Sequence, residues 1–172
     1  MRVFTVGHGR RPSEELVEVL REAGIETLVD VRRFPSSRRN PQFNQGPLRE
    51  VLAEAGMAYS HAVELGGLLS DEPGETDFPC VRVRAFRSYA ARMRTPEWQE
   101  ALELEVARPR PCLMCAETSW ERCHRRMIAD FLVAKGHAVS HLLGPERREA
   151  HRLYHGSEAR EGRLYLCGQH VG

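Results

Sequence analysis

The sequence predicts one α/β domain in three layers, with a mainly parallel sheet flanked by helices on both faces and a short C-terminal extension. Short β-rich segments alternate with helical ones, and strand–helix–strand units of this kind form right-handed crossovers and parallel sheets. The 172 residues, 41% of them apolar, suffice for one core rather than two. We therefore expect a domain over residues 1–143 and an extension, residues 144–172, packed on it.

Strands are predicted where apolar and β-branched residues cluster between turn residues. These segments span residues 3–8, 27–32, 59–63, 112–116 and 138–143. Helices are predicted where apolar residues recur every three or four positions, at residues 12–24, 46–56, 86–93, 95–107 and 122–136. We expect Ser13 to cap the first helix, Pro47 to open the second, and Gly24 and Gly56 to end them. The polar tail after Gly144 predicts a helical turn plus a short hairpin or edge strand.

Charge and hydropathy restrict the class of protein. The formal net charge is +1, so total charge does not indicate a nucleic-acid binder. No segment has the roughly 18 consecutive apolar residues of a membrane span, and the N-terminus lacks the apolar core of a signal peptide. We expect a cytoplasmic protein that does not bind membranes.

The five cysteines form no regular framework, and their odd number favours free thiols in a reducing compartment. Cys112 and Cys115 have the spacing of a zinc motif. If they lie on one strand, however, residues three apart point to opposite faces, so they cannot share one ion. We expect no bound metal and no cofactor, with Cys112 and Cys115 as small core residues.

Polar residues follow three predicted strands at the point where each strand ends. His8 follows the first strand, Asp30 and Arg32 end the second, and Glu117 follows the strand at 112–116. The carboxyl ends of parallel strands share one edge of the sheet, which is where open α/β sheets bind ligands. His8, Glu117, Cys123 and His124 are the candidate catalytic residues at this edge.

Cys123 lies near the start of a predicted helix, between Arg122 and Arg125. The helix dipole and these cations favour a thiolate, so Cys123 is a candidate nucleophile; the alternative is a packed thiol on the inner face of the helix. The segment resembles the Cys and Arg loops of phosphatases and rhodaneses only inexactly, because Cys115 and Arg122 are separated by six residues where the phosphatase signature has five.

Arginines cluster without acidic neighbours at residues 31–39 and 81–93, and only Lys135 among the 25 basic residues is a lysine. Arginine suits phosphate and carboxylate groups, and a helix N-terminus adds backbone donors. The predicted anion-binding residues are Asp30, Arg32, Arg38 and Arg125, with Arg38 as a lid. The alternative is that the arginines are solvated or paired with Asp30, Glu117 and the acidic segment 71–77. Without ligand, we expect Asp30 and Glu117 to pair with arginines.

Five segments together resemble the domain of unknown function 488 family. They are TVGHG (5–9), DVRRFPSSRRNPQF (30–43), GMAYSHAVELGG (56–67), FRSYAARMRTPEW (86–98) and LMCAETSWERCHRRMIADFL (113–132). The resemblance covers about residues 3–143 and implies a small α/β protein without an assigned activity. The family's characteristic residues match Gly7, His8, Asp30, Arg32, Pro35, Ser37, Arg38, Phe43, Leu65, Gly66, Gly67, Tyr89, Met93, Cys115, Glu117, Cys123, His124 and Arg125. Gly9 stands where the family usually has serine, so a hydroxyl there is not essential.

Two functional hypotheses follow. The first is an enzyme acting on a phosphate-bearing small molecule or nucleic acid at the arginine-rich edge of the sheet. The second is a nucleic-acid-binding module without chemistry, in which the arginines follow the phosphate backbone. The sequence specifies neither the substrate nor the oligomeric state.

Overall fold

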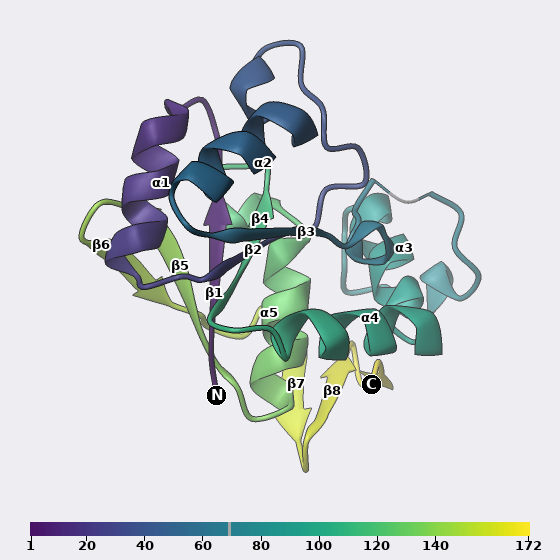
Figure 1. The fold of residues 1–172 in the computed structure, drawn as a ribbon. Helices are drawn as coiled ribbons and strands as arrows, with labels where there is room; N and C mark the ends of the chain where they lie inside the picture. The colour runs from purple at the N-terminus through teal and green to yellow at the C-terminus, as the bar shows by residue number, and fades with distance from the viewer. Residues whose placement is uncertain (69) are drawn as a thin grey trace.

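A computed structural model describes residues 1–68 and 70–172. Its main sheet has six strands in the order β3-β2-β4-β1-β5-β6 (Figure 1). The first five strands pair in parallel and β6 is antiparallel to β5. The strands are β1 (Arg2–Gly7), β2 (Thr27–Asp30), β3 (Ala58–His61), β4 (Pro111–Cys115), β5 (Ala138–Gly144) and β6 (Arg147–Ala150). The predicted α/β class and mainly parallel sheet are confirmed.

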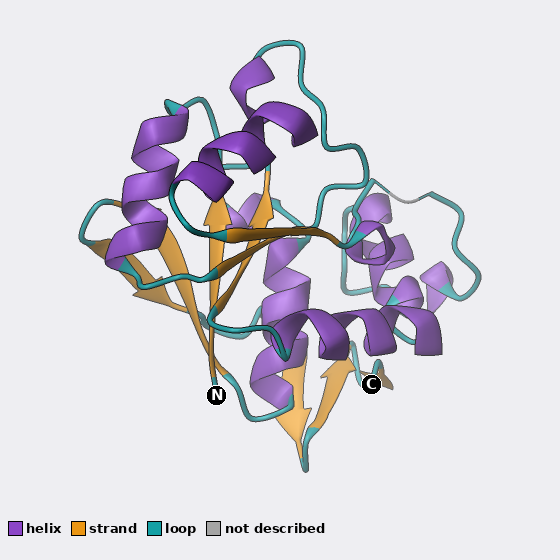
Figure 2. Cartoon of the chain, in the orientation of Figure 1, coloured by secondary structure: helices purple, strands orange, loops and turns teal. Residues whose placement is uncertain are grey.

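Helices cover both faces of this sheet (Figure 2). They are α1 (Ser13–Glu22), α2 (Gln45–Glu54), α3 (Arg84–Arg92), α4 (Pro96–Val106) and α5 (Arg125–Ala134). Four short 3-10 segments lie between them: η1 (Pro41–Phe43), η2 (Val63–Leu65), η3 (Glu75–Asp77) and η4 (Trp120–Arg122). No helix in the described ranges is both long enough and apolar enough to cross a membrane.

Two apolar clusters, one on each face, hold the layers together. The cluster under α1 and α2 includes Leu16, Leu20 and Cys112, whereas the cluster under α3, α4 and α5 includes Trp98 and Cys115. Cys112 and Cys115 therefore do point to opposite faces of β4, as the two-residue period of a strand requires.

Several helix boundaries differ from those the sequence predicts. Helix α1 is preceded by Pro12 as its N-cap, and Ser13 is its first residue with no side-chain capping bond. Helix α2 begins at Gln45, two residues before Pro47. The predicted break between α3 and α4 is present, and there the Thr95 hydroxyl accepts the Trp98 N–H at 3.3 Å. A proline and a capping threonine together end one helix and start another.

The tail forms strands instead of the predicted helical turn. After β6 it contains a small antiparallel sheet, β7 (Ser157–Arg160), β8 (Arg163–Leu166) and β9 (Gln169–His170). Leu164, Leu166 and Val171 of this segment lie in the cluster under α5, and Figure 1 shows β7 and β8 beside one end of that helix. Cys167 forms a disulfide with Cys80, which contradicts the expectation of free thiols. The proximity of residues 87 apart is a tertiary feature that spacing alone does not reveal.

Candidate functional site

Three neighbouring strands end side by side at the centre of the sheet. Strand β4 lies between β2 and β1, and Gly7 pairs with Cys115 in the register. Past the strand ends, the His8 N–H donates to the Cys115 carbonyl at 3.0 Å and the Val31 N–H donates to the Met114 carbonyl at 2.9 Å. These bonds fix the chain immediately after each strand, so the residues that follow are positioned by the sheet itself.

Asp30 and Arg32 form a buried ion pair at this edge. Arg32 Nε donates to Asp30 Oδ1 at 2.8 Å and Nη2 to Oδ2 at 2.6 Å, and the Tyr59 hydroxyl donates to Oδ2 at 2.8 Å. Asp30 is fully buried and Arg32 is 6% exposed. The predicted pairing of Asp30 with an arginine is confirmed. Arg32 also donates to the Phe43 carbonyl at 2.8 Å, so most of its donors are already used.

The hydrogen bonds of His8 determine its tautomer. Arg32 can only donate, so His8 Nε2, 3.2 Å from Arg32 Nη1, is an acceptor and Nδ1 carries the proton that it donates to the Gly9 carbonyl at 2.9 Å. The ring stacks on Phe43 with centroids 4.3 Å apart. Burial, aided by the charge of Arg32, lowers the pKa of His8 to about 4, so the ring is neutral at pH 7.

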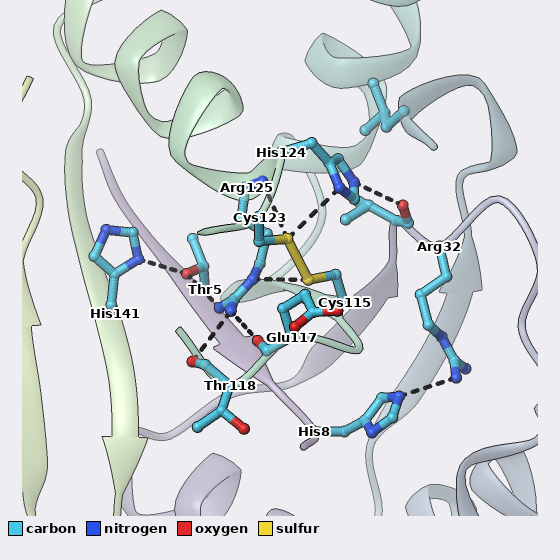
Figure 3. The surroundings of a disulfide bond; sticks show 12 residues. Thr5, His8, Arg32, Cys115, Glu117, Thr118, Cys123, His124, Arg125 and His141 are labelled. Carbon is cyan, nitrogen blue, oxygen red and sulfur yellow. Dashed lines mark hydrogen bonds between the residues drawn. A yellow bond between two sulfur atoms is a disulfide. The ribbon is translucent and has the colours of Figure 1, made fainter. Parts of the chain in front are cut away.

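Cys115 and Cys123 are bridged as a disulfide between the end of β4 and the segment that leads into α5 (Figure 3). The sequence predicts a free core thiol for Cys115, and this prediction is wrong in the oxidised state seen here. The loop between the two cysteines folds back, so that the end of the strand and the start of the helix meet. Both residues are almost completely buried, at 2% and 3% exposed.

His124 lies against this pair with a defined tautomer. Its Nε2 is 3.0 Å from the Val31 carbonyl, which only accepts, so Nε2 carries the proton and the Nδ1 lone pair faces Cys123 Sγ at 3.5 Å. One edge of the ring borders a cavity. The rest of the His124 ring is buried, and this burial lowers the pKa of His124 to about 4 because it disfavours the imidazolium. Gly67 makes room for the ring, since a Cβ there would lie 2.7 Å from Nδ1.

Arg125 is buried beneath the loop that follows β4 and does not line the cavity. Its Nε donates to Cys115 Sγ at 3.1 Å, Nη1 to the Thr5 hydroxyl at 3.2 Å, and Nη2 to the Glu117 main-chain carbonyl (Figure 3). The expected pairing of the Glu117 carboxylate with an arginine is wrong, because the exposed Glu117 side chain forms no ion pair with the residues that the structure describes. The loop comes this close because residue 7 is glycine; a Cβ there would clash with the Glu117 carbonyl.

A cavity of about 530 Å³ opens over these groups. Of the predicted site residues, it is lined by His8, Arg32, Glu117, Cys123 and His124, but not by Asp30, Arg38 or Arg125. Arg38 is exposed and lies outside the lining, next to Ser37, which does line the cavity, so its role as a lid stays a prediction. The lining also includes residues absent from the predicted set, namely Arg33, Phe34, Leu68, Phe86, Tyr89, Cys115 and Arg122.

Two of the four arginines of the second cluster form ion pairs with the acidic segment. Arg84 pairs with Asp71 and with Glu75, and Arg92 with Glu72; Arg94, just after the cluster, pairs with Asp77. This agrees with the alternative that these arginines are paired rather than available for a ligand.

A chain of buried hydrogen bonds extends away from Arg125. The Thr5 hydroxyl lies 2.7 Å from His141 Nδ1, His141 Nε2 lies 2.9 Å from His151 Nδ1, and His151 Nε2 lies 2.8 Å from Asp130 Oδ1. The carboxylate only accepts, so His151 Nε2 donates to Asp130, and burial lowers the pKa of His141 to about 3, so the His141 ring is neutral at pH 7. This chain is not among the features predicted from the sequence. Asp130, an acid in the apolar face of α5, could have indicated it, because a lone acid among core residues needs hydrogen-bond partners.

Three buried histidines of the site and the chain predict an acid-sensitive fold. The pKa values of His8, His124 and His141 are about 4, 4 and 3, all lowered by burial, against about 6.5 when unfolded. The unfolded state therefore binds protons first, and stability is complete above pH 6.5 and falls as the pH approaches the folded values. We expect the free energy of unfolding to fall by about 5 kcal/mol between pH 7 and pH 5, as measured by urea denaturation.

The matched variants separate this effect from general acid denaturation. His8→Gln keeps one donor and one acceptor but does not titrate, so roughly a third of the pH-dependent loss should disappear. Substituting the exposed His155 with glutamine should leave the loss unchanged. Equal pH dependence in all three proteins would contradict the assignment.

Cys115, Cys123 and His124 are also residue types that bind metal ions, and their donor atoms lie within 4.8 Å of one another. A bridged sulfur, however, is not the thiolate that coordinates zinc. A metal ion at this position would require the reduced pair. The expectation of no metal stays a prediction.

Comparison with known proteins gives one finding. A family model described as "Domain of unknown function DUF488" matches residues 12–132 of the 172-residue chain. The matched range contains the Cys115–Cys123 loop and the Asp30–Arg32 pair, and begins after His8. Searches of the curated proteins and of the solved structures found no match.

Proposed function

The chain belongs to the Domain of unknown function DUF488 family, and from the geometry of its cavity we propose that it is an enzyme in which the Cys123 thiolate attacks a small phosphate-bearing substrate. The reactive form is the reduced one, so we further propose that the protein works in a reducing compartment such as the cytoplasm.

The observation that supports this proposal most strongly is the alignment of Cys123, His124 and Val31 at the base of the cavity. Cys123 Sγ faces His124 Nδ1 at 3.5 Å, and the opposite ring nitrogen is held by the Val31 carbonyl at 3.0 Å. A nucleophile, a base and a group that orients the base are the three parts of an activated thiol. A thiolate on Cys123 would raise the pKa of the neighbouring imidazole, because opposite charges stabilise each other.

The start of α5 supplies further stabilisation for a thiolate. The Arg125 main-chain N–H points at Cys123 Sγ, with nitrogen and sulfur 3.4 Å apart. Helix N-termini carry partial positive charge, and a cysteine placed there has a lowered thiol pKa. The thiolate is therefore favoured by backbone dipoles as well as by His124.

The lining of the cavity indicates what kind of molecule enters. Phe34, Phe86 and Tyr89 give it an apolar wall, while Arg33 and Arg122 are exposed arginines that form no ion pair within the described ranges. Arginine binds phosphate through a planar pair of donors. A substrate with an apolar body and a phosphate group fits this combination, with Glu117 as the carboxyl group of the lining available for proton transfer.

Alkylation of the reduced protein tests the proposal. We expect iodoacetamide to modify Cys123 faster than Cys112, with mass spectrometry locating the label, because Cys112 is buried on the opposite face and burial raises its pKa. Phenyl phosphate, which combines an aromatic ring with phosphate, should slow the labelling of Cys123. In the absence of phenyl phosphate, His124→Ala should slow the labelling of Cys123.

Two arginine variants provide the matched control. Arg33→Ala combined with Arg122→Ala should abolish protection by phenyl phosphate, whereas Arg39→Ala should not, since Arg39 is exposed but lies outside the cavity. If no phosphate-bearing compound protects Cys123, or if the Arg39 variant loses protection equally, the proposed substrate class is wrong.

A further inference from the structure

The two disulfides of the described ranges lie in different surroundings. Cys80–Cys167 fastens the C-terminal sheet, and neither cysteine lines the cavity, whereas Cys115 and Cys123 both do. The Cα atoms of Cys115 and Cys123 are 7.7 Å apart, against 5.6 Å for Cys80 and Cys167. Most structural disulfides span 4.4–6.8 Å. The cavity pair therefore borders the cavity and is more widely spaced than a typical structural crosslink.

Arg125 gives the pair an unusual electrostatic environment. The residue is 1% exposed, and no carboxylate of the described residues lies within ion-pair distance of it. Burial lowers its pKa to about 10. A buried cation without a counter-ion is strongly unfavourable. Cys115 Sγ lies 3.1 Å from Arg125 Nε and can become an anion in contact with the guanidinium, but only when the bridge is reduced.

The reduced pair would thus contain two stabilised thiolates of different kinds. Arg125 stabilises the Cys115 thiolate through its buried guanidinium, and the start of α5 stabilises the Cys123 thiolate through a main-chain N–H. Thiolates, not thiols, attack disulfides, and two of them in reach of each other can complete an exchange. Neither property is needed by a crosslink whose only task is to hold the fold.

We propose that the Cys115–Cys123 pair has a second activity, the reduction of small anionic disulfides that enter the cavity. Cys123 attacks one sulfur of the substrate R–S–S–R, forming a mixed disulfide and releasing one thiolate, RS⁻. Cys115 then attacks Cys123 Sγ, which closes the protein bridge and releases the second RS⁻. The substrate gains two electrons, the pair loses two, and a low-molecular-weight thiol reductant restores the reduced pair.

The same cavity selects the substrate class in both proposals, but the second activity does not depend on phosphate. The apolar wall of the cavity and the arginines of its lining favour a disulfide with aromatic and anionic groups. Dithiobis-nitrobenzoate has both properties and releases a coloured thiolate. It therefore serves as the probe.

The test follows the stoichiometry of that release from protein reduced with dithiothreitol and then desalted. This treatment also reduces Cys80–Cys167, which adds the same release to every protein compared. Wild type should release two coloured thiolates per chain from the pair, and its mass should show a Cys115–Cys123 bridge with no retained adduct. Cys115→Ser should release one and keep the aromatic group on Cys123. The control Cys112→Ala, on the opposite face of β4, should behave as wild type.

A second measurement addresses Arg125. Arg125→Gln removes the charge. The rate of thiolate release at pH 6 should then fall about tenfold for each unit by which the pKa of the Cys115 thiol rises, whereas Arg125→Lys should retain most of that rate. If Arg125→Gln does not fold, the number of thiolates released by Cys115→Ser still decides whether the pair completes the exchange.

Three results would overturn this second activity. They are a retained adduct on wild type, as many thiolates released by Cys115→Ser as by wild type, or a zinc ion that copurifies with the reduced pair and blocks both thiols. The first two do not affect the protection of Cys123 by phenyl phosphate. Conversely, a failure of that protection leaves the stoichiometry of exchange unchanged, so the two proposals fail separately.

Discussion

Arg32→Ala is expected to lower the free energy of unfolding by about 3–5 kcal/mol, measured by urea denaturation. The substitution removes the partner of Asp30, which is fully buried and is held by two bonds from the arginine. The Tyr59 hydroxyl and the main-chain N–H of residue 32 would remain as donors, but two neutral donors do not offset the lost charge of a partner for a buried carboxylate. The large effect comes from the unpaired charge that stays behind rather than from the energy of the pair itself.

Two further variants separate these explanations. Arg33→Ala removes the exposed neighbouring arginine and should change stability by no more than about 0.5 kcal/mol. Combining Asp30→Asn with Arg32→Met removes both charges, and this double variant should be more stable than Arg32→Ala alone. A loss below about 1 kcal/mol for Arg32→Ala would show that Asp30 finds another partner or reaches water.

Replacing both Cys80 and Cys167 with serine is expected to lower the free energy of unfolding by about 3–5 kcal/mol. The bridge closes a loop with a sequence separation of 87, and a crosslink of this length restricts the unfolded chain strongly. It also joins the C-terminal sheet to the segment before α3, the helix that carries Phe86 and Tyr89 of the cavity wall. The variant should therefore also expose the C-terminal sheet to proteolysis.

Reductant supplies the internal control for this prediction. In excess dithiothreitol the wild type loses the same bridge, so the difference between wild type and variant should nearly vanish. A variant as stable as the oxidised wild type would contradict the assigned crosslink. A difference that persists in reductant would instead indicate that the serines disturb packing.

The sequence alone determined most of the fold because its local patterns have one physical meaning each. The apolar spacing in α1 and the Thr95–Pro96 break specified helices, and the short apolar runs specified strands. The tail was different. Polar segments such as β6 become strands only because β5 offers an edge to pair with, and a helical turn is equally compatible with the local sequence.

The same distinction applies to the candidate site. That His8, Asp30 and Arg32 meet at one edge follows from parallel strands, whose carboxyl ends share a side of the sheet. Only the tertiary structure decided where the long side chains of Arg38 and Arg125 go, that Cys115 reaches Cys123, and that His141 and His151 connect Thr5 to Asp130. A strand fixes the positions of its own residues. The direction of a flexible side chain, and the partner of a cysteine or a buried charge, depend on which distant segment packs against it.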